Sequence, residues 1–396
     1  MFKKKTVKDI EVANKRIVVR LDWNVPADKN GGVTDDFRIR ASLPTINYLL
    51  DKGCSLVILS HRGRPDSPNK QLSLELVAKK ASEIITHPVK FVDDLIGESA
   101  SQAVEKLKFG EILLLQNTRF YPEEKSGDED FAKKLAGYGE IFVFDAFALA
   151  HRSDASAVGI DKFLPSVAGF LVEQEISQLS KALDNPTEPL LAITGGAKLE
   201  TKLPLLDNLM KLADNIVVAG VMAKILLHAM GYKVGKSIFD ADDIATAKEV
   251  LAKAQNSGVK FILPTKDVAV AKEFDEKSRK VVQLSDIADD EYILDFGEQS
   301  IEDVKRLISE AKTIIWNGPL GYYENPAFAK GSEEIARAIA DSEAESVVGG
   351  GDTADVVDSL GLADKFSHVS TGGGASLDFM SGKKLPAIEA LQDRGN

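Results

Sequence analysis

The sequence predicts an α/β protein with two domains, each built on a parallel sheet. The chain has 396 residues, more than the ~250–300 residues at which single hydrophobic cores stop growing. Short runs of Val, Ile, Leu and Phe alternate with helical patterns almost from end to end, as in parallel sheets with right-handed crossovers. A long amphipathic stretch divides the two halves and stops at Asn185-Pro186, because proline cannot continue a helix.

The strands of the first half are predicted from continuous apolar runs, which are typical of strands covered on both faces. Helical patterns separate these runs and cover residues 40–52, 73–86 and 130–135. The predicted strands are residues 16–22, 54–60, 111–117 and 140–148.

The same alternation resumes after the central amphipathic stretch. We expect residues 172–188 to form an interdomain helix between a domain of residues 1–171 and a domain of residues 189–376. A helical connection of this kind would let the two domains move relative to each other as rigid bodies. The predicted strands of the second domain are residues 190–194, 215–219, 260–264, 313–317 and a run that starts at residue 345.

Composition and charge narrow the function classes. With 49 Lys and Arg against 61 Asp and Glu, the formal charge is −12, which argues against general binding to nucleic acids or membrane surfaces. The single cysteine, Cys54, cannot form an internal disulfide and fits a reducing compartment. The basic N-terminal residues are not followed by the apolar segment that a secretory signal would have. The most apolar stretch, residues 215–230, is interrupted by Lys224 and His228 and is too short to span a bilayer. We therefore expect a cytoplasmic protein.

Three glycine clusters stand where strands of the second half should end, at residues 195–196, 349–351 and 372–374. Glycine between a strand and a helix lets backbone N–H groups approach an anion, and the helix N-terminus adds its positive dipole. A single glycine pair is more often only a tight turn, but three clusters in one half exceed what turns require. Asp352 follows the second cluster, where its carboxylate could meet a Mg²⁺ ion.

Other phosphate-binding signatures are absent. The nearest match to G-x-x-x-x-G-K-[ST], at residues 231–237, is one residue short and follows a helical pattern, so we interpret it as a turn. No G-x-G-x-x-G motif opens a helix, which weighs against a dinucleotide dehydrogenase. The five histidines have no zinc-site spacing.

Basic residues follow the strands of the first half. Because the carboxyl ends of parallel strands share one sheet edge, we expect these side chains to form a cradle for phosphate and carboxylate groups. Asp22 and Asn24 end the first strand; Asp22 could accept from substrate hydroxyls or could pair with a neighbouring arginine. The basic residues are Arg38, Arg40, His61, Arg62, Arg64, Arg119, His151 and Arg152.

The order of these segments resembles that of the phosphoglycerate kinase family over nearly the full chain. The first half carries VRLDWNVP from Val19, FRIRASLPTI from Phe37, SHRGRP from Ser60, LLQNTRFYPEE from Leu114 and AHRSDAS from Ala150. The second half carries GGAKLETKL from Gly195, WNGPLGYYE from Trp316, GGGDT from Gly349 and HVSTGGGASL from His368.

The resemblance implies two groups of site residues. The 3-phosphoglycerate site would lie in the N-terminal domain and comprise Asp22, Asn24, Arg38, His61, Arg62, Gly63, Arg64, Arg119 and Arg152. The nucleotide site would lie in the C-terminal domain and comprise Lys198, Lys202, Gly220, Ile293, Asn317, Glu324, Gly350, Gly351, Asp352 and Thr353. Glu324 would take the ribose hydroxyls, and Asp352 the Mg²⁺ of the nucleotide.

The resemblance also implies a fold and a reaction. The fold is two Rossmann-like doubly wound domains joined by a helix and hinge, with residues 377–396 returning to the first domain. The reaction, part of glycolysis and gluconeogenesis, is Mg²⁺-dependent phosphoryl transfer from 1,3-bisphosphoglycerate to ADP, giving 3-phosphoglycerate and ATP. It would proceed in line after hinge closure, and the family suggests a monomer. In the reverse direction the acceptor carboxylate is already ionised, so positioning and cations carry the catalysis. The catalytic groups would be Arg38, Lys198, Lys202 and the backbone N–H groups of the Gly351 and Gly373 loops.

Several positions depart from the family pattern. Ala148-Leu149 replaces a common Gly-Thr or Gly-Ser, and Trp23 replaces a phenylalanine. Residues 219–221 replace three glycines with Ala-Gly-Val, and Ile293 stands at a frequent glycine position. The last two changes add side-chain bulk near the nucleotide.

Two other classes of protein stay open as alternatives. A two-domain binding protein for phosphorylated metabolites would need the basic cradle but not Asp352 beside a second, glycine-lined site. It would also usually carry a secretion signal. A dinucleotide dehydrogenase would need the glycine fingerprint that is missing here.

Overall fold

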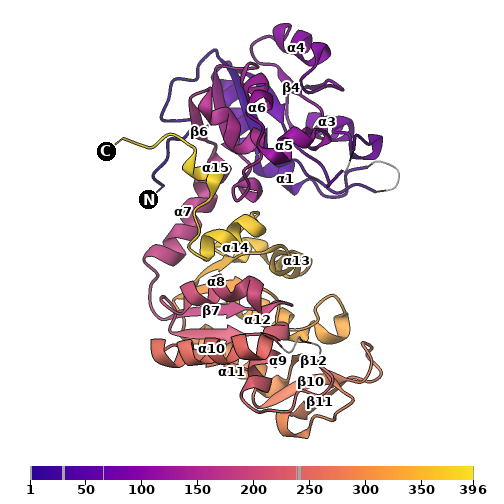
Figure 1. The fold of residues 1–396 in the computed structure, drawn as a ribbon, viewed down its shortest axis with the longest axis vertical. Coiled ribbons are helices and arrows are strands. Elements are labelled where there is room, and N and C mark those ends of the chain that lie inside the picture. Colours follow the sequence, from indigo (N-terminus) through magenta and orange to yellow (C-terminus); the bar gives the residue numbers. More distant parts are fainter. Residues whose placement is uncertain (1, 29–31, 66, 238, 240–241, 396) are drawn as a thin grey trace. The chain divides into compact units, whose positions relative to one another are not determined.

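The computed structural model describes residues 2–28, 32–65, 67–237, 239 and 242–395. The chain forms two compact units (Figure 1). Unit 1 comprises Met1–Ser177 and Lys384–Asn396, and unit 2 comprises Gln178–Lys383. The C-terminal segment belongs to unit 1 because Lys5 N–H donates to the Gln392 carbonyl at 2.8 Å and Arg394 N–H to the Lys3 carbonyl at 2.8 Å.

Unit 1 contains a six-stranded sheet with the order β3-β4-β2-β1-β5-β6, and every pair of neighbouring strands is parallel. Each of the four predicted runs contains a strand. The structure adds the edge strands β3 and β6, whose sequences Val-Lys-Phe and Ser-Val-Ala each contain a polar residue and give no continuous apolar run. The strands are β1 Arg16–Leu21, β2 Ser55–Leu59, β3 Val89–Phe91, β4 Ile112–Leu114, β5 Ile141–Asp145 and β6 Ser166–Ala168.

The prediction of one helix over residues 40–52 is wrong. The segment forms two helices, α1 (Phe37–Ala41) and α2 (Leu43–Asp51), which meet at Ser42. Pro44 has no N–H to donate to the carbonyl of residue 40, so the first helix cannot continue through it. The Ser42 hydroxyl instead accepts from the Trp23 indole N–H at 3.0 Å. The other α-helices of this part of the chain are α3 Glu75–Ile84, α4 Glu98–Glu105, α5 Pro122–Ser126, α6 Glu129–Ala136 and α15 Pro386–Glu389.

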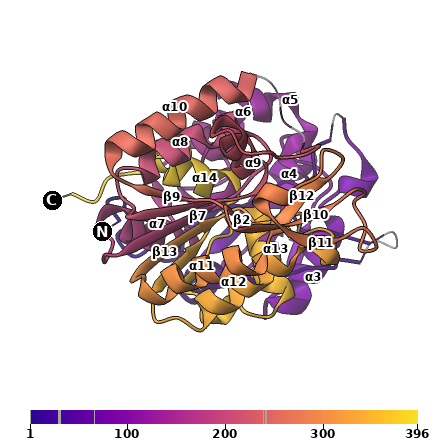
Figure 2. The ribbon, with the colours of Figure 1, turned by 90° about the horizontal axis from the view of Figure 1, so that it is seen from below.

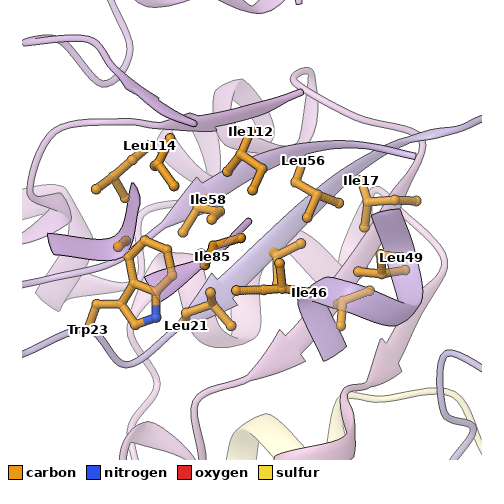
Figure 3. Close-up of a cluster of buried hydrophobic side chains, with 14 of the residues drawn as sticks. Ile17, Leu21, Trp23, Ile46, Leu49, Leu56, Ile58, Ile85, Ile112 and Leu114 are labelled. Carbon is orange, nitrogen blue, oxygen red and sulfur yellow. The ribbon is translucent and has the colours of Figure 1, made fainter. Parts of the chain in front are cut away.

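The core of unit 1 lies between β1, β2 and β4 and the helices on one face of the sheet (Figure 3). Alternate residues of β1, from Ile17 to Leu21, point to this face. They pack with Ile46 and Leu49 of α2, and Trp23 closes the end of the cluster near Leu114. All of these side chains are fully buried. The core therefore fixes the segment that directly follows β1, where Asp22 and Asn24 lie.

Unit 2 contains a six-stranded parallel sheet with the order β15-β14-β13-β7-β8-β9. The strand order therefore reverses between β7 and β13, and open α/β sheets bind ligands at such a switch point. The five runs predicted for this half are confirmed as strands. The strands are β7 Leu190–Thr194, β8 Asn215–Val218, β9 Lys260–Ile262, β13 Thr313–Asn317, β14 Glu345–Val348 and β15 His368–Val369.

A three-stranded antiparallel sheet, absent from the sequence-based prediction, lies at one edge of unit 2 (Figure 1). Its order is β11-β10-β12, with β10 at Asp267–Ala271, β11 at Lys280–Gln283 and β12 at Tyr292–Phe296. The register shifts between Ala269 and Val270, and β11 is largely exposed and leaves no apolar run. β10 does carry a buried apolar run over residues 268–271, but the sequence-based prediction assigned no strand to it.

Helices cover both faces of the large sheet of unit 2 (Figure 2). One face carries α8, α9, α10 and α14, and the other carries α11, α12 and α13. The helix α7, Phe170–Asp184, ends directly before Asn185-Pro186. No described helix combines the length and hydrophobicity needed to cross a bilayer. The helices are α8 Leu199–Leu209, α9 Gly220–Ala229, α10 Asp242–Ser257, α11 Glu298–Glu310, α12 Lys330–Ala340, α13 Gly351–Ser359 and α14 Gly374–Met380.

Candidate functional site

A cavity of about 410 Å³ opens in unit 2 at the switch point of the large sheet. Residues at the carboxyl ends of β7, β8, β13 and β14 line it, as expected for ligand sites in open α/β sheets. Of the residues predicted to bind a nucleotide, all except Lys198 line this cavity. They are Lys202, Gly220, Ile293, Asn317, Glu324, Gly350, Gly351, Asp352 and Thr353.

Asn317 connects three segments around the cavity. Its side-chain carbonyl accepts a hydrogen bond from the Lys202 ammonium, and its amide group donates to the Gly349 carbonyl at 2.6 Å. Its backbone carbonyl accepts from Gly195 N–H at 3.0 Å. Burial lowers the pKa of Lys202 to about 8, although the Asp352 charge acts in the opposite direction. Lys202 is thus a cation fixed beside the glycine loops.

The Gly350 loop is shaped to receive an anion. Gly350 caps α13 with a φ of 98°, a conformation that residues with a Cβ avoid. In the part of the chain that the structure describes, the first-turn N–H groups of Gly351, Asp352 and Thr353 have no hydrogen-bond acceptor. These groups and the helix dipole favour a negatively charged ligand. The Thr353 hydroxyl faces the other way and accepts from Gly318 N–H at 2.6 Å.

Gly220 serves a different purpose from the Gly350 loop. Its φ is +64°, and a Cβ there would lie 2.9 Å from the Gly196 nitrogen. The first N–H groups of α9 are already bonded, Gly220 to the Leu320 carbonyl at 3.0 Å and Val221 to the Gly196 carbonyl at 3.1 Å. The glycine therefore lets two loops cross closely.

Of the catalytic residues predicted for the C-terminal domain, Lys198 and Gly373 lie outside the cavity lining. Lys198 is exposed at the N-cap of α8. Gly373 caps α14 with a φ of 50° and is likewise absent from the residues that line the cavity. Their roles stay predictions.

Sequence reasoning missed several residues that line the cavity. They include Lys224 of α9, the buried Asp295 of β12, and Phe274, Tyr292, Tyr322 and Tyr323. Burial raises the pKa of Asp295 to about 7 and that of Tyr323 to about 12, with Asp352 acting in the same direction on Tyr323. Phe274, Tyr292 and Asp295 belong to the unpredicted antiparallel sheet or its connections, so no motif pointed to them. Tyr322 and Tyr323 lie inside the WNGPLGYYE segment, but the prediction took only Asn317 and Glu324 from it as site residues.

The departures from the family pattern can be located. The side chains of Val221 and Ile293 line the cavity, whereas Ala219 is buried behind it. Leu149 ends a short 3₁₀ turn over Phe147–Leu149, in which both end residues are buried. The following Ala150 carbonyl accepts from Ala387 N–H at 3.1 Å in the C-terminal segment.

In unit 1, the residues that follow the strands form a second site. Asp22 is paired with Arg38, so the structure favours the pairing alternative. Its other carboxylate oxygen lies 3.9 Å from Nδ1 of His61. Arg20, Arg38, Arg119 and Arg152 all act electrostatically on His61, so these side chains are neighbours. We call these four arginines and His61 the basic cluster.

The electrostatics of the basic cluster keep His61 neutral. Burial, together with the four arginines, holds the pKa of His61 well below its usual value. Burial also lowers the pKa of Arg119 to about 10, and Arg152 adds to this effect. Arg152 is paired with Asp154 at 2.9 Å, and this hydrogen bond raises its pKa. The positive charge of the cluster is therefore carried by arginines.

Arg20 is the member of the basic cluster that the sequence-based prediction missed. It is fully buried, donates to the Ser156 hydroxyl at 2.8 Å and lies 3.3 Å from Nδ1 of His61. Its nearest carboxylate, Glu124, is 3.8 Å away. Arg20 lies inside β1, and in the sequence nothing distinguishes it from the other residues of that strand. Only its burial in the structure places it in the basic cluster.

The loop after β2 orients Arg119. Asn24 accepts from Gly63 N–H at 2.8 Å, and the Gly63 carbonyl accepts from Arg119 at 2.8 Å. The Arg62 guanidinium is directed at the backbone, to the carbonyls of Val25 at 3.3 Å and Gln71 at 2.5 Å. Arg64 is exposed. Arg119 Nε is buried without a partner within the described residues, which leaves a donor for a ligand.

Comparison with known proteins identifies the family. The model of the family described as phosphoglycerate kinase matches residues 7–383. The chain belongs to the phosphoglycerate kinase family. The phosphoglycerate kinase of Dictyoglomus turgidum is 45% identical over 396 residues, covering 99% of this chain and 100% of that protein. That of Finegoldia magna is 46% identical over 395 residues, with the same shares covered.

Solved structures agree with the family assignment. The structure of phosphoglycerate kinase from Coxiella burnetii matches with a TM-score of 0.89 and 38% identity, over 98% of each chain. The structure from Pyrococcus horikoshii matches with a TM-score of 0.82 and 32% identity, again over 98% of each chain. The predictions of two parallel-sheet α/β domains and of a phosphoglycerate kinase are confirmed, and the binding-protein alternative is not favoured.

Proposed function

We propose that this chain catalyses reversible, Mg²⁺-dependent phosphoryl transfer from 1,3-bisphosphoglycerate to ADP, which gives 3-phosphoglycerate and ATP. One observation carries the proposal. A cavity with Lys202, Asp352 and a glycine-capped helix lies in unit 2, and a cluster of arginines lies at the strand ends of unit 1. These two kinds of site suit the two substrates of a phosphoglycerate kinase.

The glycerate substrate is assigned to unit 1. Arg119 and Arg152 offer planar guanidinium groups that can hold phosphate or carboxylate oxygens in pairs. Asp22 and Asn24 stand beside them, where they can accept from or donate to the substrate hydroxyl and carboxyl groups. His61 is neutral near pH 7 and acts as a hydrogen-bonding group, while Arg62 and Gly63 hold the loop that carries Arg64.

The nucleotide is assigned to the cavity of unit 2. Lys202 and the free N–H groups of the α13 N-terminus would bind its phosphates, with Lys198 and Gly373 as further contacts. Asp352 offers one carboxylate beside these phosphates, and Mg²⁺ commonly takes one or two carboxylates plus phosphate oxygens. The donor set therefore fits the ion, which would neutralise charge on the phosphates. Glu324 would receive the ribose hydroxyls.

The chemistry depends on positioning and charge. A carboxylate acceptor is ionised at neutral pH, so no residue has to remove a proton from it. Arg38 and Lys202 supply positive charge for the phosphoryl group as it moves, and the N–H groups of the Gly351 and Gly373 loops supply donors. Once the two domains have closed, these groups would hold fixed positions, so little reorganisation is needed during the transfer.

We further propose the domain organisation that this reaction requires. Residues 1–171 with 377–396 would bind the glycerate, residues 189–376 the nucleotide, and residues 172–188 would form the connecting helix. Closure of the two domains would bring the substrates together and exclude water. We also propose that the protein is a cytoplasmic monomer, since the family resemblance suggests a monomer and the single cysteine fits a reducing compartment.

A coupled assay tests this function. The purified chain is supplied with ATP, Mg²⁺ and 3-phosphoglycerate, and product formation is followed by a dehydrogenase that oxidises NADH. NADH oxidation that needs all three components supports the proposal. Binding of 3-phosphoglycerate without any turnover would instead indicate a binding protein.

A further inference from the structure

The cavity of unit 2 has a region that the phosphate-binding groups do not explain. Helix α9 packs against β12 there, and Tyr292, Ile293 and Leu294 of β12 line the wall. The Phe274 ring lies 4.9 Å from the Tyr292 ring and 5.7 Å from the Tyr322 ring. Aromatic and aliphatic walls of this kind suit the flat faces of a nucleobase.

Lys224 is the basic side chain in this apolar region. It follows Gly220 by one helical turn, about 6 Å along α9, and Leu227 follows it on the same face. Leu227 is fully buried and belongs to an apolar cluster with Ile293. Lys224 thus lines the cavity between the glycine crossing and this cluster.

The Lys224 side chain is partly buried, and among the described residues its ammonium has neither a hydrogen-bond acceptor nor an ion-pair partner. Burial lowers its pKa to about 8. Placing a lysine among apolar side chains is unfavourable unless its charge finds an acceptor. A hydrogen-bond acceptor on a bound ligand would give the Lys224 ammonium the partner that the described residues do not supply.

We propose that Lys224 is a specificity-determining residue for the nucleobase, and that it favours 6-oxopurine nucleotides relative to adenine nucleotides. This inference rests on the proposed assignment of the nucleotide to this cavity. A lysine ammonium has three donors and no acceptor. Guanine and hypoxanthine present O6 and N7 as adjacent acceptors, whereas adenine presents a donating amino group at the same edge.

Calorimetric titration with ADP, GDP and IDP tests this role in the wild-type chain and two variants. In Lys224→Met, which keeps the length but removes the charge, the ratio of the GDP to the ADP dissociation constant should rise about tenfold or more. Lys224→Gln should raise it further, because its amide oxygen can accept from the adenine amino group. IDP should follow GDP, since both carry O6 and N7.

Lys236→Met is the matched control. Lys236 is an exposed cation whose ammonium lies 5.6 Å from the Tyr292 ring, so its loss should leave the ratio unchanged. A ratio that changes less than twofold in folded Lys224→Met, or IDP binding that follows ADP, would overturn the role of Lys224. If the wild-type chain bound none of the three nucleotides, the role of Lys224 would be overturned as well. Failure of the proposed function appears separately, as absent turnover with both ATP and GTP despite measurable binding.

Discussion

Arg38 and Asp22 form an ion pair at the carboxyl end of the unit 1 sheet, although one lies in α1 and the other follows β1. Asp22 is buried, whereas about a third of the Arg38 side chain (36%) is exposed. Burial also lowers the pKa of Arg38. The pair therefore holds a cation at the edge of the basic cluster, with part of its guanidinium accessible to a substrate.

Replacing this cation should affect catalysis more than binding. In Arg38→Ala, we expect kcat to fall roughly 10²–10³-fold, the usual effect of losing one donor that acts mainly in the transition state, worth ~3–4 kcal/mol. The KM for 3-phosphoglycerate should change much less, because Arg119 and Arg152 remain in the cluster. Steady-state kinetics measure both constants.

The control for this substitution is Arg64→Ala. Arg64 is exposed on the loop after β2, so its removal should mainly raise KM. Circular dichroism confirms that both variants fold. A near-wild-type kcat for Arg38→Ala would remove Arg38 from the catalytic groups.

Removal of Mg²⁺ should separate the two sites. With EDTA, turnover should be lost while 3-phosphoglycerate binding stays nearly intact, because Asp352 belongs to unit 2 and the basic cluster to unit 1. Calorimetric titration of 3-phosphoglycerate with and without EDTA measures this. Loss of glycerate affinity on chelation would contradict the assignment of metal and glycerate to different units.

Asp295 should make folding stability depend on pH. Its pKa is about 7 in the folded chain and about 3.9 when unfolded, so the folded state keeps a proton that the unfolded state releases. The contribution of Asp295 to the free energy of unfolding is therefore fully present below about pH 4 and is lost as pH rises through 7. Between pH 5 and 8, wild type should lose about 3 kcal/mol relative to Asp295→Asn.

Urea unfolding without nucleotide, measured at several pH values, gives this difference. Asp145 and His61 are present in both chains, so their own titrations cancel. Asp289→Asn, at an exposed surface carboxylate, is the control and should show no comparable change. A constant difference between wild type and Asp295→Asn over this pH range would exclude a protonated Asp295.

Domain closure should need both substrates, since each unit is proposed to bind only one of them. Small-angle scattering should show a smaller radius of gyration with 3-phosphoglycerate and a non-hydrolysable ATP analogue together than with either ligand alone. The same radius of gyration for the free protein, for the protein with either ligand alone and for the protein with both ligands would exclude closure driven by the two ligands.

The sequence predicted those parts of the fold that long apolar runs specify. Strands such as β1 and β7 are buried on both faces and leave a continuous pattern. The edge strands β3 and β6 contain polar residues, and β11 is largely exposed, so these strands leave no such pattern. The short apolar run of β10 was missed although it is fully buried. The split between α1 and α2 follows from Pro44, a local signal that the helical periodicity concealed.

The residues of the candidate site also fall into those that the sequence could predict and those that it could not. Glycine clusters and arginines at strand ends could be predicted because parallel sheets bring strand ends together. Arg20 and Lys224 could not, because their importance lies in burial, and the charge of a single residue in a strand or helix does not reveal burial. Likewise, the spacing of Lys198 and Lys202 gave no indication that only Lys202 lines the cavity.

Trapping of the acyl phosphate product tests the central claim most directly. The chain is incubated with ATP, Mg²⁺, 3-phosphoglycerate and hydroxylamine, which converts an acyl phosphate into a hydroxamate. Transfer to the carboxylate predicts one hydroxamate for each ADP formed, and no hydroxamate when 3-phosphoglycerate is left out. Release of ADP and phosphate without hydroxamate would show ATP hydrolysis instead, and would contradict the assignment of a phosphoryl-accepting glycerate to the basic cluster.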